Sequence, residues 1–244
     1  PLVLTYHTKY DVDIAKAVRG KLLQESAIRA LVQNIASCDE VWVVSRGAGE
    51  NLRSLGYEGD YIVMENGVDV PRGRVSDEAI AAATGRYDLP QNVPVFLFVG
   101  RLMWYKGIRI ILDALKTLRE KNVDFRMVFV GEGADGAEIR SYAEERKLSD
   151  RCFFTGAISD REIIRAWYGR SDLFLFPSTF DTNGLVVREA AASGTATVMI
   201  RNSCASEGVG DGRNGFCIEE NATAMAAKLE ELCRAPEVMQ VVGE

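Results

Sequence analysis

Short apolar runs rich in β-branched and aromatic residues alternate, along this chain of 244 residues, with longer segments of helical periodicity. Strands separated by helices run parallel, because a parallel pair needs a long crossover connection. Strands that are apolar on both faces must also be covered on both faces. The alternation therefore predicts an α/β fold in which helices cover parallel sheets. We expect strands at 2–6, 41–44, 61–64, 95–100, 125–131, 151–156, 173–177 and 195–200.

Two punctuated stretches divide this pattern. ENGVDVPRG (65–73) contains an Asn-Gly turn, a proline and two glycines, and DLPQNVP (88–94) follows it. From Val95 the alternation is clearest, and an amphipathic stripe follows the first strand there. That stripe consists of Ile108, Ile111, Leu112, Leu115 and Leu118. We therefore expect a complete domain over 91–244. Over 1–90 we expect a linker and a partial domain whose beginning is missing. About three strands are too few for a doubly wound domain, and the chain starts at Pro1.

Composition and charge exclude several classes of protein. The net charge of −6, from 35 acidic and 29 basic residues, argues against nucleic acid as a partner. The five cysteines are widely spaced and form no CxxC pair, so neither a zinc site nor a disulfide framework is indicated. Free thiols fit a reducing compartment, and we expect a cytoplasmic protein.

The first candidate site is GRLMWYKG (100–107), which lies where a strand ends and a helix begins. Ligands of open parallel sheets bind outside the carboxyl ends of the strands. Arg101 and Lys106 bring two cations beside the positive end of a helix, a combination suited to a diphosphate. The segment is neither GxGxxG nor GxxxxGK[ST], which counts against NAD enzymes and P-loop NTPases. A strand–helix loop with two solvated basic residues explains it equally well.

The second candidate site is FPSTFDTNGLVVREAAASGTA (176–196). Asp181 and Glu189 are eight residues apart, the first in a loop and the second in the second turn of a helix that begins near Gly184. Glu189 is suited to accept hydrogen bonds from a vicinal diol such as ribose. Three amides at the helix start are placed to bind phosphate oxygens, those of Gly184, Leu185 and Val186.

The alternative for this segment is an ordinary helix start. In that case Asp181, Thr182 or Asn183 caps the helix, and Glu189 lies on its solvated face. For the segment taken alone, the residues favour this alternative.

Taken together, the segments resemble the family-4 (group 1) retaining glycosyltransferases, whose GT-B fold has two Rossmann-like domains. In that family GRL…KG precedes a PS…E-x(7)-E segment with G[LI]V before the second Glu and EAxASG after it. The resemblance covers nearly the whole chain and implies a complete C-terminal domain and a partial N-terminal one. The matching segments, in order, are HTKY (7–10), ENGVD (65–69), FVGRLMWYKG (98–107), FVGEG (129–133), FFTGAIS (153–159), FPS (176–178), DTNGLVVREAAASGTA (181–196) and DGRNGF (211–216).

The resemblance assigns roles residue by residue. Arg101 and Lys106 match the pair that neutralises the donor diphosphate. Glu189 matches the ribose-binding Glu, and the amides of Gly184, Leu185 and Val186 match those that face the donor sugar and phosphates. The backbone at Ala157 and Ile158 matches the segment that meets the base.

His7, the only histidine, falls where the family has a histidine near the transferred sugar. A lone histidine after a strand is otherwise more often structural. Three departures lie in the donor-sugar loop: Asp181 stands for the first Glu of the motif, and Thr182 and Asn183 follow where aromatic or Gly positions are usual. Ala196 replaces the usual Pro, and the Gly-rich acceptor loop of the family is absent.

The resemblance implies transfer of a sugar from a UDP-, GDP- or ADP-sugar to a carbohydrate or lipid-linked acceptor, with retention of configuration. No metal-binding DxD is evident, so we expect a metal-independent reaction without a cofactor, in which cations and a helix N-terminus stabilise the leaving diphosphate. Peripheral membrane association of the full-length protein is left open. This chain, with half of the acceptor side missing, is expected to transfer sugar poorly or not at all.

Three other interpretations remain. A non-catalytic nucleotide-sugar-binding module is credible because of Asp181. The same scaffold also carries sugar-nucleotide epimerases and glycogen-type phosphorylases, although a phosphorylase needs a lysine for pyridoxal phosphate and a much longer chain. A scaffold without any ligand is the third, and the joint presence of the motifs argues against it.

Overall fold

The computed structural model describes residues 1–243, and of Lys16 only the backbone. Contacts between Cα atoms divide the chain into two compact units. The first unit comprises residues 1–67, 180–184 and 202–207, and the second comprises 68–179, 185–201 and 208–244. This division differs from the domain boundary expected near residue 90, which stays a prediction. No helix among the described residues is both long enough and apolar enough to cross a membrane.

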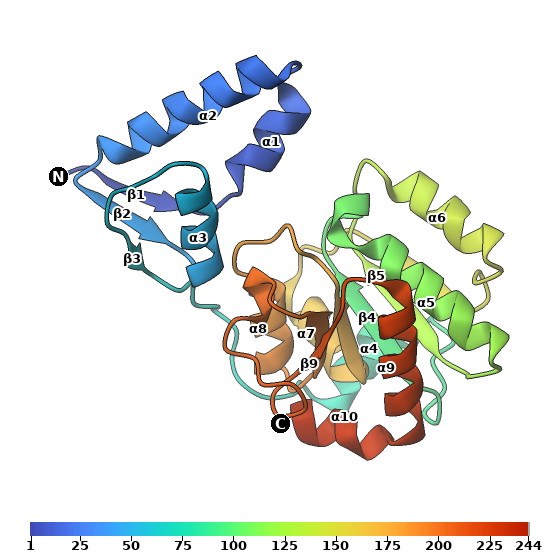
Figure 1. Cartoon of the computed structure of the whole chain (residues 1–244). Coiled ribbons are helices and arrows are strands. Elements are labelled where there is room, and N and C mark those ends of the chain that lie inside the picture. The colour runs from blue at the N-terminus through green and yellow to red at the C-terminus, as the bar shows by residue number, and fades with distance from the viewer. Residues whose placement is uncertain (244) are drawn as a thin grey trace. The chain divides into compact units, whose positions relative to one another are not determined.

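The first unit contains the three expected strands, β1 (Val3–Tyr6), β2 (Glu40–Val43) and β3 (Ile62–Val63). They form a parallel sheet in the order β1-β2-β3 (Figure 1). Helices α1 (Tyr10–Ala17) and α2 (Lys21–Ala36) connect β1 to β2, and α3 (Arg46–Ser54) connects β2 to β3. A small core of aromatic and aliphatic side chains joins this sheet to α2 and α3. Its largest fully buried members are Tyr6, Ile35 and Leu52.

The second unit contains one parallel sheet of six strands, in the order β6-β5-β4-β7-β8-β9. Five of its strands were expected from their apolar runs: β4 (Val95–Val99), β5 (Arg126–Val130), β6 (Cys152–Gly156), β7 (Leu173–Phe176) and β8 (Thr197–Ile200). The sixth, β9 (Phe216–Ile218), was not expected, because its three residues adjoin a loop rich in glycine and polar residues. The predicted parallel sheet is therefore confirmed and extended by one strand.

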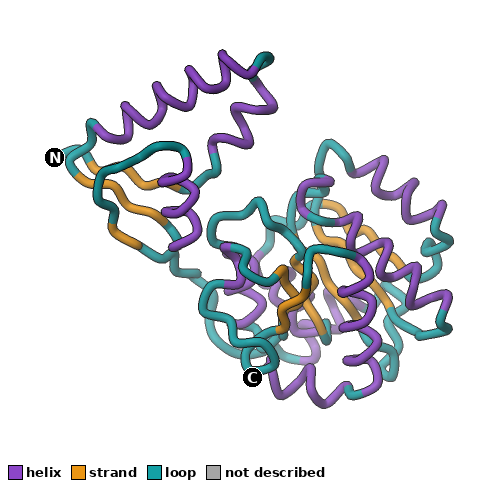
Figure 2. The backbone as a smooth tube through the Cα atoms, viewed as in Figure 1, coloured by secondary structure: helices purple, strands orange, loops and turns teal. Residues whose placement is uncertain are grey.

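Helices cover both faces of this sheet, as the continuous apolar strands predicted (Figure 2). All five residues of β4 are buried, which requires cover on both sides. On one face α5 (Ile108–Glu120), α6 (Gly136–Glu145) and α9 (Ala222–Arg234) pack on a core that contains Phe96 and Phe98. The whole predicted stripe of α5 is fully buried in this core. The remaining elements of the second unit are α4 (Asp77–Thr84), η1 (Trp104–Lys106), α7 (Arg161–Arg170), α8 (Leu185–Ala192) and α10 (Pro236–Gly243).

The loops at the carboxyl ends of neighbouring strands are joined backbone to backbone. The amides of Gly100 and Leu102, after β4, donate to the carbonyls of Val130 and Glu132, both at 3.0 Å. Gly107, between η1 and α5, has a φ of +76°, and a Cβ atom there would lie 2.2 Å from the carbonyl oxygen of Pro177, just after β7. Only glycine permits this approach. The loops after β4, β5 and β7 therefore form one continuous edge.

We expect Gly107→Ala to lower the free energy of unfolding far more than Gly212→Ala does. Both glycines have a φ of +76°, but nothing lies within 4 Å of a Cβ atom at Gly212. The control should lose about 1–2 kcal/mol from the left-handed conformation alone. Gly107→Ala should lose a further 1–3 kcal/mol from the clash with Pro177. Urea denaturation of the two variants checks this, and equal losses would show that the Pro177 contact yields freely.

Candidate functional site

The two predicted cations of the GRLMWYKG segment lie beside one aromatic ring at the carboxyl end of β4. The Arg101 guanidinium carbon is 5.9 Å from the centroid of the Tyr105 ring, and Lys106 Nζ is 5.6 Å from it. Arg101 is exposed, whereas Lys106 is only 8% exposed. Two positive charges held near one ring repel each other, and an anion between them relieves that repulsion. The structure thus brings both predicted cations to one aromatic ring, and their binding of a diphosphate stays a prediction.

Tyr105 is a part of this site that the sequence reading missed. It lies between Trp104 and Lys106 in the same loop, and the available signal was an aromatic residue between two cations. The face of a phenol ring attracts cations. Tyr105 is therefore placed to attract both Arg101 and Lys106.

Glu189 lies in the second turn of α8 and is half-buried rather than on a solvated helix face. The Tyr168 hydroxyl is 3.4 Å from Glu189 Oε2 and 3.2 Å from the carbonyl oxygen of Val186, so its proton serves one acceptor at a time. Burial raises the pKa of the Glu189 carboxyl, while the Tyr168 hydrogen bond and the charge of Arg161 oppose that rise. Burial also raises the pKa of Tyr168 well above its ordinary value. Tyr168, another residue that the sequence reading missed, therefore orients the carboxylate as a neutral donor.

The loop of residues 180–184 is tied to the first unit by three short side-chain hydrogen bonds. Thr182 Oγ1 donates to the carbonyl oxygen of His7 at 2.5 Å, and Ser45 Oγ donates to the carbonyl oxygen of Thr182 at 2.5 Å. Asn183 Nδ2 donates to the carbonyl oxygen of Val44 at 2.6 Å. The structure therefore joins Thr182 to His7, just after β1, and Asn183 to Val44, just after β2. Asn183 Oδ1 is buried and has no hydrogen-bond partner among residues 1–243.

Residues 180–184 and 202–207 both come from the second half of the chain but belong to the first unit, and we call them the returning loops. The second of them, residues 202–207, is hydrogen-bonded to the N-terminus of α3 in the same unit. The Glu207 carboxylate accepts from the amides of Arg46 at 2.8 Å and Gly47 at 2.5 Å. Ser45 caps the same helix by accepting from the Ala48 amide at 3.0 Å. A carboxylate at a helix N-terminus is stabilised by the helix dipole. The start of α3 thus holds both returning loops of the first unit.

The remaining candidate residues are distributed over the two units. His7 directly follows β1 in the first unit and is exposed. Asp181 lies in the loop of residues 180–184 of that unit, which we call the tethered loop. Ala157 and Ile158 follow β6 in the second unit, on the edge that also carries Arg101 and Lys106. Gly184, with a φ of +63°, ends the tethered loop, and α8 begins at the next residue, Leu185. Val186 lies in the first turn of α8, so the three amides named from the sequence lie at its positive end.

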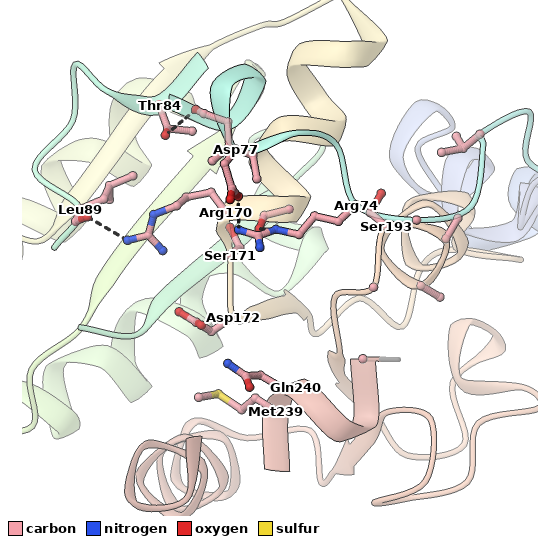
Figure 3. Close-up of a pocket in the computed structure, with 18 of the residues that line it drawn as sticks. Arg74, Asp77, Thr84, Leu89, Arg170, Ser171, Asp172, Ser193, Met239 and Gln240 are labelled. Carbon is pink, nitrogen blue, oxygen red and sulfur yellow. Dashed lines mark hydrogen bonds and ion pairs between the residues drawn. The ribbon is translucent and has the colours of Figure 1, made fainter. Parts of the chain in front are cut away.

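A cavity of about 1670 Å³ opens at the opposite edge of the second unit (Figure 3). It lies where β7 and β8 begin, between α4, α10 and the ends of α7 and α8. Two of its arginines are engaged with their own chain: Arg74 pairs with Asp77 at 3.4 Å, and Arg170 donates to the carbonyl oxygen of Leu89 at 2.8 Å. Ligands of such sheets bind at the carboxyl ends of the strands, so this cavity is not the candidate site.

No three His, Cys, Asp or Glu side chains come together as metal ligands anywhere in the described part of the chain. The five cysteines, Cys38, Cys152, Cys204, Cys217 and Cys233, are all free thiols.

Comparison with known proteins connects this geometry to one family. Residues 82–244 match the family model described as "Glycosyl transferases group 1". The alpha-monoglucosyldiacylglycerol synthase of Streptococcus pneumoniae is 23% identical over 242 residues, which is 98% of this chain and 55% of that protein. A D-inositol 3-phosphate glycosyltransferase of Xylanimonas cellulosilytica is 31% identical over 210 residues, 81% of this chain and 49% of that protein. The chain spans about half the length of these curated relatives.

Solved structures share the fold. The crystal structure of Anabaena HepE in complex with UDP and glucose matches with a TM-score of 0.82 and 21% identity, over 100% of this chain and 65% of that chain. A sucrose-phosphate synthase from Thermosynechococcus elongatus matches with a TM-score of 0.81 and 24% identity, over 99% of this chain and 61% of that chain. These likenesses confirm the α/β fold with Rossmann-like parallel sheets that the sequence predicted.

We expect Glu189→Gln to gain stability relative to wild type as the pH rises from about 4 to 7. A carboxyl whose pKa is raised by folding binds its proton more tightly in the native state, so its contribution to stability is lost as the pH rises through the raised pKa. The Gln variant has no such proton to lose. Urea midpoints of both proteins across this range measure the difference, with Glu145→Gln, an exposed position on α6, as the control. A difference from wild type that does not change with pH would contradict the burial of this carboxyl.

Proposed function

The chain belongs to the group 1 family of glycosyl transferases, and on that premise we propose that it binds a nucleotide-sugar donor for transfer of the sugar to an acceptor. The observation that carries this proposal is the pair of cations, Arg101 and Lys106, beside the Tyr105 ring at the carboxyl edge of the second unit. Because the chain spans about half the length of its relatives, the activity of the whole protein is part of the proposal.

Charge separation is the main demand of this reaction. As the glycosidic bond to the donor breaks, the sugar gains oxocarbenium character and the nucleoside diphosphate gains negative charge. We assign Arg101 and Lys106, with the amides of Gly184, Leu185 and Val186 at the start of α8, to stabilising that charge. Protein groups then supply the positive charge, so the proposed reaction is metal-independent and needs no cofactor.

The nucleoside half of the donor is assigned to the same unit. Glu189 accepts hydrogen bonds from the ribose diol, and the Tyr168 hydroxyl behind it supports the orientation of the carboxylate. The backbone at Ala157 and Ile158 meets the base.

The transferred sugar is assigned to the tethered loop and its neighbour His7. Asn183 Oδ1 is a buried acceptor without a protein partner, which a sugar hydroxyl would satisfy. Asp181 replaces the longer Glu of the family and contacts the same sugar. The proposed outcome is retention of configuration, with the donor phosphate helping to deprotonate the acceptor on the face from which it leaves.

The proposed acceptor is a carbohydrate or a lipid-linked molecule. The names of the relatives support both, since one is a synthase of a glucosyldiacylglycerol and another acts on D-inositol 3-phosphate. The five free thiols support a cytoplasmic location. The second candidate function, a non-catalytic nucleotide-sugar-binding module, is favoured by the shortened Asp181.

We expect Arg101→Ala and Lys106→Ala each to weaken a nucleoside diphosphate about tenfold to a hundredfold, and to leave the free nucleoside unchanged. Charge-assisted hydrogen bonds of this kind are worth roughly 1.5–3 kcal/mol. Calorimetry with both ligands measures the difference, and Lys116→Ala, which removes an exposed cation from α5, is the matched control. Equal losses for nucleoside and diphosphate would show that the two residues only support the fold.

The proposed donor binding is tested directly by thermal shift with UDP, GDP and ADP and their sugars. We expect one base to stabilise the chain by about 2.7 kcal/mol at one hundred times its dissociation constant. The absence of any shift at millimolar concentration would contradict the proposal. The stabilising donor is then incubated with a mixture of carbohydrate and lipid acceptors. Release of the nucleoside diphosphate together with a glycosylated acceptor identifies a transferase, since hydrolysis by water would release it without that product. Binding without release, by the full-length protein as well, identifies the non-catalytic module.

A further inference from the structure

The turn between α1 and α2 exposes two adjacent leucines. Leu22 is 77% exposed and Leu23 is 64% exposed, both in the first turn of α2. Single exposed apolar side chains are ordinary on protein surfaces. Two adjacent ones at the end of a helical hairpin expose a larger apolar surface to solvent. Such a surface indicates a contact with something outside the unit.

This turn has a fixed shape. Gln24 Nε2 donates to the carbonyl oxygens of Val18 at 2.8 Å and Ala15 at 3.3 Å, which closes the end of α1. The amides of Leu23 and Gln24 both donate to the carbonyl oxygen of Gly20 at 3.1 Å. The leucines are therefore presented by hydrogen-bonded backbone, and their exposure belongs to the fold.

The turn is also positively charged within an acidic chain. Residues 18–23 contain two basic residues and no acidic one, and the nearest acidic residues along the chain are Asp13 and Glu25, whereas the whole chain has a net charge of −6. Arg19 and Lys21 flank Gly20, and neither makes an ion pair with the described residues. Two exposed leucines beside unpaired cations form a surface that is complementary to an anionic lipid bilayer.

We propose that residues 18–23, the α1–α2 tip, dock on the surface of an anionic lipid bilayer. Leu22 and Leu23 enter the boundary between headgroups and acyl chains, and Arg19 and Lys21 pair with lipid phosphates. A protein partner is a poorer fit, because a stable protein interface buries about 800 Å² on each side, far more than two leucines supply. A bilayer can bury two inserted leucines completely, because the lipids rearrange around the inserted side chains.

The tip and His7 belong to the same unit and are joined by α1. Helix α1 has eight residues, starts three residues after His7 and is about 12 Å long at 1.5 Å per residue. Docking would therefore bring the first unit to the surface in which a lipid acceptor lies. This use of the tip rests on the proposed function, whereas membrane docking itself does not.

The experiment is sedimentation of the chain, without any donor, with vesicles of phosphatidylcholine alone or of phosphatidylcholine and phosphatidylglycerol in equal parts. We expect binding to the anionic vesicles at low ionic strength. Arg19→Gln/Lys21→Gln should weaken it about 25-fold, from about fivefold for each basic residue. Leu22→Ser/Leu23→Ser should weaken it at least about tenfold. The controls are Lys116→Gln/Lys147→Gln for charge and Leu2→Ser, a leucine that is 60% exposed elsewhere in the first unit.

A second measurement separates insertion from simple charge attraction. Leu22→Trp should show a blue shift of its fluorescence on addition of the anionic vesicles, because the indole leaves water. Equal binding to both kinds of vesicle, wild-type binding by the double leucine variant, or no binding by wild type would each overturn the proposal. Because no sugar nucleotide is present, failure here leaves the proposed donor site untouched, and failure of donor binding leaves the tip untouched.

Discussion

The contact between Gly107 and the carbonyl oxygen of Pro177 determines how the candidate site is built. It presses the turn that carries Lys106 against the end of β7, the neighbouring strand of the sheet. Parallel pairing puts the carboxyl ends of β4, β5 and β7 at one edge of the sheet. The contact of Gly107 with Pro177 leaves no room for a side chain at position 107. The cations after β4 are consequently fixed to the edge from which the chain leaves β7.

The two acidic positions of the family motif are held in different ways. Glu189 is positioned within the second unit by Tyr168, a buried neutral phenol. Asp181 belongs to a loop that Ser45, Thr182 and Asn183 tie to the ends of β1 and β2. Ser45 uses its hydroxyl twice, as the acceptor that caps α3 and as the donor that holds Thr182. One short side chain therefore links the start of a helix to the loop assigned to the donor sugar.

The fold was largely predictable, because buried parallel strands carry a local signal. Runs such as VFLFV are too apolar for any exposed position, and the stripe of α5 has a clear helical period. Strand β9 was not predicted, because three residues are too few to show an apolar pattern typical of a strand. The site residues came from resemblance, since local spacing alone allowed plain helix capping. Tyr168 and Ser45 could not be found, because their partners are 21 and 137 residues away and no local pattern reports such distances.

The chain passes between its two compact units at residues 67/68, 179/180, 184/185, 201/202 and 207/208. Nature and engineers recombine proteins by exchanging contiguous stretches, and a cut after residue 67 would look like the natural place. Such an exchange would leave Asn183 facing the end of another protein's β2 and Glu207 facing the start of its α3. Asn183 is buried, and loss of its partner would cost about 1–3 kcal/mol, whereas the exposed Glu207 would lose less. A chimera between relatives must therefore carry the start of α3 together with both returning loops, so that these three segments are inherited as one block.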